Sequence, residues 1–299
     1  MTKAGTVALI GRPNAGKSTL LNALMQTKVA ITSAKAQTTR NVILGVYNDD
    51  QGQIVFLDTP GFHQPKDALS SMMVKSTVAT LKEVDLILFM IDITKKEKAV
   101  DKTLYDLVKQ TSSPVFAIVN KIDMMNRNAI IPLLEHYATN YEFNEIIPLS
   151  ALNQDNLDRL VEIILKELPE QERLYPQEQL TQLTYQFYIS EVIREKLLNL
   201  TNQEIPHSSA VVIDTLSFTD STCTIEASII VEKDSQKGIV IGAKGALKNE
   251  IIKQVSMELR RQYGLKILLS LHVKVDKDWR LKTSKINAYL NPNQSEYEQ

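Results

Sequence analysis

Residues 11–19 read GRPNAGKST and follow the short apolar run VALI at 7–10. Residues 20–25 then show the apolar-rich opening of a helix. A strand, a loop of the form G-x-x-x-x-G-K-S and a helix together are typical of a phosphate-binding loop. Gly11 and Gly16 allow the tight turn that points backbone N–H groups at phosphate oxygens near a helix N-terminus. The sequence therefore predicts a nucleotide site here.

Individual residues of this loop have distinct expected roles. Lys17 is expected to place its ammonium group against the β- and γ-phosphates, and Ser18 to offer its hydroxyl to Mg2+. The other residues expected to contact the nucleotide from this loop are Gly11, Arg12, Pro13, Asn14, Ala15, Gly16 and Thr19.

The composition is that of a soluble globular protein. The chain has 299 residues, 43% hydrophobic and 23% charged, which is enough for two domains of ordinary size. A net charge of −1 excludes neither nucleic acid nor a membrane surface as a partner, because local patches matter more than the total. The single cysteine, Cys223, excludes an intramolecular disulfide, suits a reducing cytoplasm and is expected to be buried and inert.

A second motif, Asp58-Thr59-Pro60-Gly61, follows a strand expected at 53–57. Asp58 can hold Mg2+ through water, and the Gly61 N–H can reach a γ-phosphate. We also assign Thr59, Pro60 and Phe62 to the nucleotide site. The polar loop at 32–40 is expected to supply a threonine to Mg2+; Thr39 is preferred and Thr38 is the alternative, because spacing does not separate them.

A third motif selects the base. Asp123, in Asn120-Lys121-Ile122-Asp123, can accept hydrogen bonds from N1–H and the 2-amino group of guanine, which adenine does not offer at that edge. Asn120 can tie this loop to the phosphate-binding loop, and Lys121 can lay its stem along the base. Ile122 completes this motif. Farther along, Ser150 and Ala151 follow another strand and can place a backbone N–H near guanine O6.

Strands and helices alternate over residues 1–168, and each motif lies at the carboxyl end of a strand. This pattern predicts a doubly wound, mostly parallel α/β sheet with its ligand at the carboxyl edge. The expected strands are 7–10, 41–47, 53–57, 86–91, 115–119 and 145–149, and the expected helices are 20–25, 69–81, 100–109, 129–137 and 157–168. This half resembles the translation-factor class of P-loop GTPases.

Residues 169–180 contain two prolines and several charges, which indicates a linker. Residues 181–285 then follow the order helix, strand, strand, helix, helix, strand, with a G-x-x-G turn between the last two helices. This order resembles a KH domain of the bacterial type (type II), an α+β fold. The C-terminal tail, 286–299, has no interpretable pattern.

A KH domain uses its G-x-x-G loop to clamp a single-stranded nucleic-acid backbone. Residues 233–285 carry 13 Lys and Arg against 5 Asp and Glu, a local net charge of +8. We therefore expect RNA binding, with lysines on phosphates and bases in the groove beside Ile241. The residues assigned to RNA are Lys237, Gly238, Ile241, Gly242, Ala243, Lys244, Gly245 and Lys248.

The whole chain resembles the Era family of bacterial GTPases. Besides the domain order, the similar stretches are GRPNAGKSTLLN at 11–22, SAKAQTTR at 33–40, DTPGFH at 58–63, NKID at 120–123, YPQEQLT at 175–181, SEVIREKL at 190–197 and GIVIGAKG at 238–245. The resemblance implies a monomer that binds GTP or GDP with Mg2+ and binds the 3′ end of 16S rRNA. It also implies a role in 16S rRNA processing and 30S subunit biogenesis, a cytoplasmic location and peripheral contact with the inner membrane.

Phe62 stands where Ras-like enzymes have the glutamine that orients the attacking water. The resemblance implies slow, K+-stimulated hydrolysis, with Asn14 as a ligand of the ion. Asn14, Lys17, Thr39 and Gly61 are the expected catalytic residues, and Ser18, Thr39 and Asp58 the expected Mg2+ ligands. The alternative function is an RNA-binding assembly factor in which the nucleotide is chiefly structural.

Overall fold

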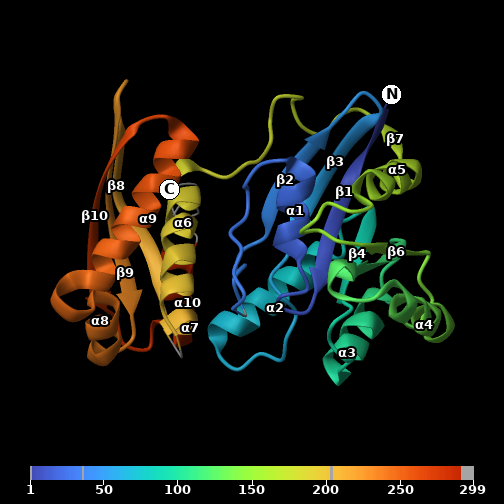
Figure 1. Cartoon of the computed structure of the whole chain (residues 1–299), viewed down its shortest axis with the longest axis horizontal. Helices are drawn as coiled ribbons and strands as arrows, with labels where there is room; N and C mark the ends of the chain where they lie inside the picture. Colours follow the sequence, from blue (N-terminus) through green and yellow to red (C-terminus); the bar gives the residue numbers. More distant parts are fainter. Residues whose placement is uncertain (1, 36, 203–204, 291–299) are drawn as a thin grey trace. The chain divides into compact units, whose positions relative to one another are not determined.

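A computed structural model describes residues 2–35, 37–202 and 205–290. The chain forms two compact units (Figure 1). Unit 1 comprises Met1–Thr32, Thr39–Pro65 and Met72–Gln182; unit 2 comprises Ser33–Thr38, Lys66–Ser71 and Leu183–Gln299. Two short segments next to the phosphate-site motifs, 33–38 and 66–71, thus group with the C-terminal half of the chain.

Unit 1 is built on a sheet with the strand order β2-β3-β1-β4-β5-β6. Only β2 runs antiparallel to its neighbour on this path, and the other neighbours pair in parallel. The strands are β1 (Thr2–Gly11), β2 (Ile43–Asn48), β3 (Gly52–Asp58), β4 (Leu86–Asp92), β5 (Val115–Asn120) and β6 (Glu145–Leu149). The predicted mostly parallel α/β fold is confirmed.

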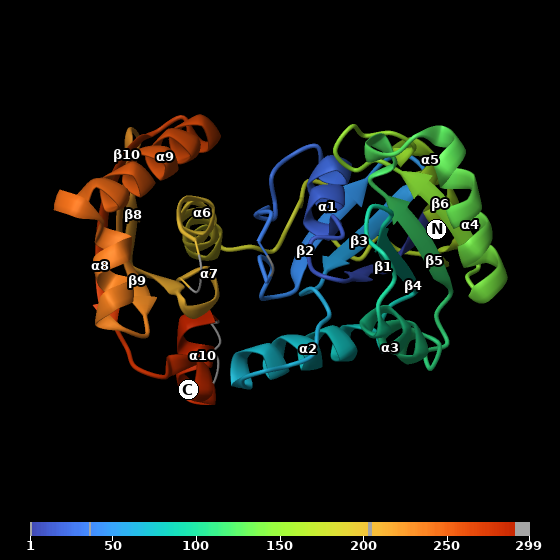
Figure 2. The ribbon, with the colours of Figure 1, turned by 60° about the horizontal axis from the view of Figure 1, so that its bottom comes forward.

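Helices cover both faces of this sheet. They are α1 (Lys17–Met25), α2 (Ala68–Thr80), α3 (Ala99–Val108), α4 (Arg127–Asn140) and α5 (Leu157–Glu167). Figure 2 shows α1 and α5 on one face and α2 and α3 on the other. On the second face, Ile10 of β1 belongs to one buried cluster with Leu104 of α3, against which Leu133 of α4 packs. Parallel strands with helices on both faces leave the carboxyl edge open for a ligand.

Residues 169–180, expected to be a linker, belong to unit 1. The short strand β7 (Glu170–Gln171) pairs antiparallel with the start of β1. Arg173 donates to Asn48 Oδ1 and to the Asp49 carbonyl, both at 2.8 Å, and the Val46 N–H donates to the Leu180 carbonyl at 2.9 Å. The Val46 bond satisfies a backbone group of the outer strand β2, and the segment covers part of an edge that would otherwise be open to pairing with another chain.

Unit 2 contains a three-stranded sheet, β10-β9-β8, in which β8 is antiparallel and β10 parallel to the central β9. Helices α6 and α9 pack against one face of it (Figure 1). Cys223 is fully buried in this core, as predicted. Its elements are α6 (Tyr185–Leu200), α7 (Ile205–Ser208), β8 (Ala210–Phe218), β9 (Thr222–Val231), α8 (Asp234–Ile241), α9 (Ala246–Tyr263), β10 (Lys266–Val275) and α10 (Thr283–Leu290).

The C-terminal end of the described chain packs in unit 2. Trp279 is fully buried and its indole N–H donates to the Ser208 carbonyl at 3.1 Å. Helix α10 crosses the predicted boundary at 285/286, with Ile286 and Leu290 buried. The rest of the predicted tail, from 291 onward, lies outside the described residues. In the described part of the chain, no helix combines the length and apolar character needed to cross a membrane.

Candidate nucleotide and RNA sites

The phosphate-binding loop joins the end of β1 to the start of α1. Gly16, the residue before α1, has φ 100°, a backbone conformation that residues with a side chain rarely adopt. A Cβ built there would lie 2.1 Å from Nδ2 of Asn120. Asn120 itself donates to the Ala15 carbonyl at 2.8 Å. Glycine is therefore required at this position, because the loop and the base-recognition motif approach each other closely.

Lys17 lies inside this loop and is only 5% exposed. Its Nζ donates to the carbonyls of Gly11 at 3.4 Å and Arg12 at 3.3 Å. Burial lowers the pKa of the ammonium, while the nearby Asp58 carboxylate opposes this shift. The two carbonyls hold a cation inside the loop, where the predicted contact with β- and γ-phosphates would be made.

Three oxygen-bearing side chains meet beside α1. The Ser18 hydroxyl donates to Asp58 Oδ2 at 2.5 Å, and the Thr39 hydroxyl lies 2.9 Å from that of Ser18 and 3.4 Å from the same carboxylate oxygen. Asp58 Oδ1 is buried and has no hydrogen-bond partner among the described residues. Burial raises the pKa of Asp58 to about 6. Such a cluster fits Mg2+, which prefers carboxylate and hydroxyl oxygens.

The threonine doublet has two different environments. Thr39 directs its hydroxyl at Ser18 and Asp58. Thr38 instead donates its hydroxyl to the Lys35 carbonyl at 2.7 Å. Thr39 is therefore the member whose side chain lies in the candidate Mg2+ site.

The Asp58–Gly61 motif lies next to the phosphate-binding loop. The Thr59 hydroxyl donates to the Leu9 carbonyl at 2.8 Å, and the Phe62 N–H donates to the Gly11 carbonyl at 3.0 Å. The Phe62 ring is 9% exposed and belongs to the buried cluster on the α2–α3 face. Phe62 thus contacts the loop through its backbone, and its side chain packs in the core.

The residues predicted to recognise the base are joined to one another and to the phosphate-binding loop by hydrogen bonds. Asn120 accepts from the Ala151 N–H at 3.0 Å, and the Ser150 hydroxyl donates to Asp123 Oδ1 at 2.5 Å. Lys121 Nζ donates to the Asn14 carbonyl at 2.8 Å. Asp123 is exposed, so its carboxylate is accessible to a base. The other residues assigned to nucleotide lie in these same segments: Pro13 and Thr19, Pro60 and Gly61, and Ile122.

Arg12 has a partner that the sequence did not predict. Its Nε lies 2.9 Å from a carboxylate oxygen of Asp101 in α3, and its Nη1 donates to the Lys96 carbonyl at 3.3 Å. The Arg12 side chain therefore binds the α3 region, and the contact of Arg12 with the nucleotide stays a prediction.

The G-x-x-G turn lies between α8 and α9, as predicted. Gly242 has φ 74°, and a Cβ there would lie 2.8 Å from the Leu247 nitrogen. Lys244 is exposed, with φ 50°. Among the other residues assigned to RNA, Gly238 and Ala243 are exposed, and Lys237, Ile241, Gly245 and Lys248 are half-buried. These residues lie in the G-x-x-G turn and in the two helices that flank it, and KH domains use the loop at this place to clamp a nucleic-acid backbone.

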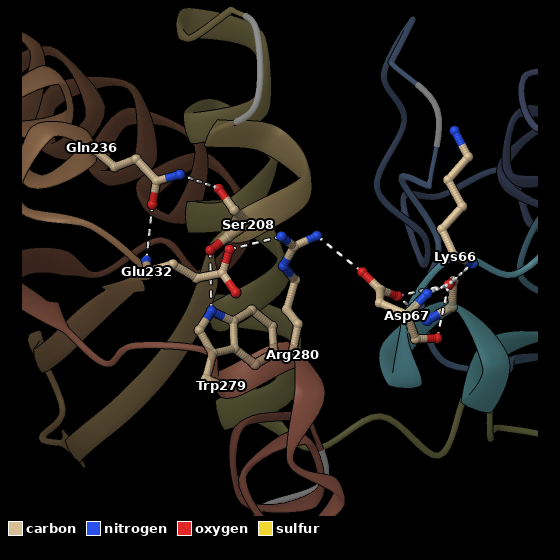
Figure 3. Close-up of polar contacts among 8 residues, drawn as sticks. Lys66, Asp67, Ser208, Glu232, Gln236, Trp279 and Arg280 are labelled. Atoms are coloured by element: carbon tan, nitrogen blue, oxygen red, sulfur yellow. Dashed lines mark hydrogen bonds and ion pairs between the residues drawn. The ribbon is translucent and has the colours of Figure 1, made fainter.

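A polar network in unit 2 links the start of α8 to segment 66–71 (Figure 3). Gln236 of α8 donates to the Ser208 hydroxyl at 2.9 Å, and Ser208 accepts from Trp279. Next to Trp279, Arg280 donates to Glu232 at 2.7 Å and to Asp67 at 3.0 Å. No local sequence pattern predicts these contacts of Arg280, because its partners lie 48 and 213 residues away.

Arg194 is a second arginine that the sequence interpretation missed. It lies in α6, within the SEVIREKL stretch, and is 2% exposed. Its Nη2 donates to the Thr38 carbonyl. A charged residue in a helix is ordinarily solvated, so the sequence carried no sign that this one is buried.

Two protein-family models match the chain. A model described as a 50S ribosome-binding GTPase matches residues 6–121, and a KH domain model matches residues 204–280. The first match contains the phosphate-binding loop, and the second contains the G-x-x-G turn.

Two solved structures are similar to nearly the whole chain. One is a tyrosine-to-alanine variant of Era from Aquifex aeolicus bound to GDP and AlF4−; it is 42% identical, covers 96% of this chain and 99% of its own, and has a TM-score of 0.93. The other is Era in complex with MgGDPNP and nucleotides 1506–1542 of 16S ribosomal RNA. It is 42% identical, covers 97% of this chain and 99% of its own, and has a TM-score of 0.94.

Proposed function

The chain belongs to the Era family of GTPases, and we propose that it is a hydrolysing GTP switch that binds the 3′ end of 16S rRNA during 30S subunit biogenesis. The observation that carries this proposal is the meeting of the nucleotide motifs through Asn120, which bonds to both Ala15 and Ala151. On this proposal the chain combines guanine recognition at Asp123 and phosphate binding at Lys17 with a KH turn at Gly242–Gly245.

The chemistry follows from these side chains. When bound, Mg2+ supplies charge that stabilises the transferring phosphoryl group. We expect Lys17 to bring a second positive charge to the phosphates and the Gly61 N–H to donate to the γ-phosphate. Phe62 cannot polarise water, because its ring is buried in the core. The attacking water must therefore be oriented by a group other than the side chain at this position.

The switch is tested by the RNA affinity of the GDP-bound and GTP-analogue-bound protein. A 3′-terminal 16S rRNA oligonucleotide is expected to bind one of the two states about tenfold more tightly, because a switch requires differential affinity. Lys244→Ala is expected to weaken RNA binding in both states and to lower the salt slope of log affinity by about 1. Fluorescence anisotropy at several salt concentrations measures both quantities.

Equal RNA affinities in the two nucleotide states would refute the switch and favour the alternative, an RNA-binding assembly factor with a structural nucleotide. Lys95→Ala is a matched control, because Lys95 is an exposed lysine of unit 1. A change in the salt slope equal to that of Lys244→Ala would mean that the G-x-x-G turn is not the site of the phosphate contact.

The proposal includes K+ as an activating ion held by Asn14. Asn14 is exposed at a bend of the phosphate-binding loop, with φ 65°. Hydrolysis by the wild type is expected to be on the order of tenfold faster in KCl than in NaCl, since one added electrostatic contact to the transition state has at least this effect. Asn14→Ala is expected to remove the difference, and Asn128→Ala, a control in α4, to retain it. Equal rates in both salts for the wild type would exclude the K+ role.

Family membership also supports the remaining parts of the proposal. These are a monomeric state, a cytoplasmic location and peripheral contact with the inner membrane. The one cysteine, buried in the core of unit 2, suits the reducing cytoplasm.

A further inference from the structure

Arg194 is a fully buried charged side chain on α6 of unit 2. Its Nε and Nη2 donate to the two carboxylate oxygens of Glu191, one turn earlier, at 2.7 and 2.6 Å. Nη2 also donates to the Thr38 carbonyl, and both residues belong to unit 2. Glu191 thus fixes the guanidinium plane by a two-point contact, and the fixed guanidinium holds one backbone carbonyl.

Packing of α6 does not account for this arginine. The core of unit 2 is contacted by other α6 residues, among them Ile189, Val192 and Leu197, all fully buried. Arg194 Nη1 is buried and has no hydrogen-bond partner among the described residues. A buried ion pair is weak evidence for stability, since a well-packed apolar side chain often serves as well or better. The contact with Thr38 is therefore the feature that distinguishes arginine from an apolar residue here.

The held carbonyl is one peptide plane from the candidate Mg2+ ligand. The carbonyl group of Thr38 and the N–H and Cα of Thr39 lie in one plane, because the peptide bond is planar. Fixing the Thr38 oxygen therefore restricts the orientation of the Thr39 N–H and the position of the Thr39 Cα. The Thr39 hydroxyl lies 2.9 Å from that of Ser18.

Further bonds hold the preceding residues on the same helix region. The Ser33 hydroxyl donates to Asn199 Oδ1 at 2.8 Å, and Lys35 Nζ donates to Asn202 Oδ1 at 3.5 Å. All four residues belong to unit 2. Segment 33–38 is thus attached at several points before the chain reaches Thr39, and Arg194 is the last of these attachments in chain order.

We propose that Arg194 is a positioning residue for GTP hydrolysis, which orients Thr39 through the Thr38 carbonyl. The inference rests on the assignment of Thr39 to Mg2+ and does not depend on which RNA is bound.

The test is GTP hydrolysis by full-length Arg194→Gln over a range of Mg2+ concentrations, without RNA. We expect kcat to fall about tenfold and the Mg2+ concentration for half-maximal rate to rise about tenfold, as when a residue supporting a metal ligand is removed. GDP affinity is expected to stay within about twofold of wild type, because switch-loop contacts to Mg2+ depend on the γ-phosphate. Arg194→Lys is expected to restore part of the rate, since it keeps a donor but not the planar fork.

The matched control is Lys274→Gln, which also removes one positive charge and one ion pair, with Asp214, in unit 2. It is expected to match wild type in kcat and in Mg2+ dependence. Thermal melting checks that each variant folds; if Arg194→Gln does not, Glu191→Gln replaces it, because it loosens the guanidinium without removing it.

A double-mutant cycle with Thr39→Ala separates positioning from a general structural role. If Arg194 acts through Thr39, Arg194→Gln is expected to cause little further loss in the Thr39→Ala background. Full additivity of the two losses would overturn the proposal. So would wild-type kcat and wild-type Mg2+ dependence in the folded Arg194 variant. The proposed switch is tested separately, by the difference in RNA affinity between the GDP and GTP-analogue states. That difference does not depend on the outcome for Arg194, so failure of this inference is distinct from failure of the proposed switch.

Discussion

Asp123→Asn is expected to weaken GTP binding by about 10²–10³-fold and to improve binding of xanthosine triphosphate. The Asp123 carboxylate is exposed and is held from one side by the Ser150 hydroxyl at 2.5 Å. It offers acceptors to N1–H and the 2-amino group of guanine, and hydrogen bonds to a charged group are worth about 1.5–3 kcal/mol each. Asparagine replaces one acceptor by a donor, which faces the 2-amino group of guanine but complements the 2-carbonyl of xanthine.

Equilibrium titration with fluorescent GTP and xanthosine triphosphate analogues measures this change of specificity. Asp106→Asn in α3 is the control, because it makes the same chemical change at an exposed position. It is expected to bind both nucleotides as wild type does. GTP affinity that is unchanged in Asp123→Asn would contradict the assignment of Asp123 to the base.

Lys17→Met is expected to lower kcat/KM for GTP by about 10²–10³-fold, the usual loss when one preorganised electrostatic contact is removed. The ammonium is buried between two backbone carbonyls, so solvent cannot replace its charge. Methionine keeps the length and apolar stem of the side chain. The loss is therefore attributable to the missing charge, and steady-state kinetics at saturating Mg2+ measures it.

The same variant has a second expected effect, on Asp58. The Lys17 charge lowers the pKa of Asp58, which burial raises to about 6. Without that charge the pKa rises further, so more of the carboxyl is protonated near pH 6 and Mg2+ must displace the proton. Calorimetric Mg2+ titrations at pH 6 and pH 8 are expected to differ more in Lys17→Met than in wild type. Lys75→Met, an exposed control in α2, is expected to change neither quantity; an equal effect there would contradict both expectations.

Local signals in the sequence were sufficient for most of the fold and for the nucleotide motifs. Apolar runs bounded by turn residues located the parallel strands, and parallel strands bring their carboxyl ends to one edge whatever their separation in sequence. The proximity of Asn120 to the phosphate-binding loop at Gly16 could therefore be predicted, although the two residues are 104 positions apart in the sequence. Family recognition and GTPase activity are confirmed by the 42% identical Era structures. The K+ site and the RNA contacts stay predictions.

Long-range side-chain contacts could not be predicted. Arg12, Arg194 and Arg280 each bind a group that no periodic pattern brings near them: Asp101 of α3, the Thr38 carbonyl and Asp67. The proline-containing segment 169–180 has the composition of a linker. Its attachment depends on the Arg173 side chain and on a backbone bond to Val46, and these partners lie more than 100 residues away in the sequence. Composition therefore indicated an irregular segment but not its place in the fold.

The buried position of Trp279 has a consequence for the order in which the chain acquires structure during synthesis. Its partner Ser208 precedes it by 71 residues, so that bond forms only after most of unit 2 has been translated. The strands and phosphate-binding loop of unit 1 are complete by residue 182, and N-terminal domains generally fold first. A nascent chain is therefore expected to hold guanine nucleotide well before its KH unit is finished, and the nucleotide would stabilise unit 1 while the ribosome completes the remainder.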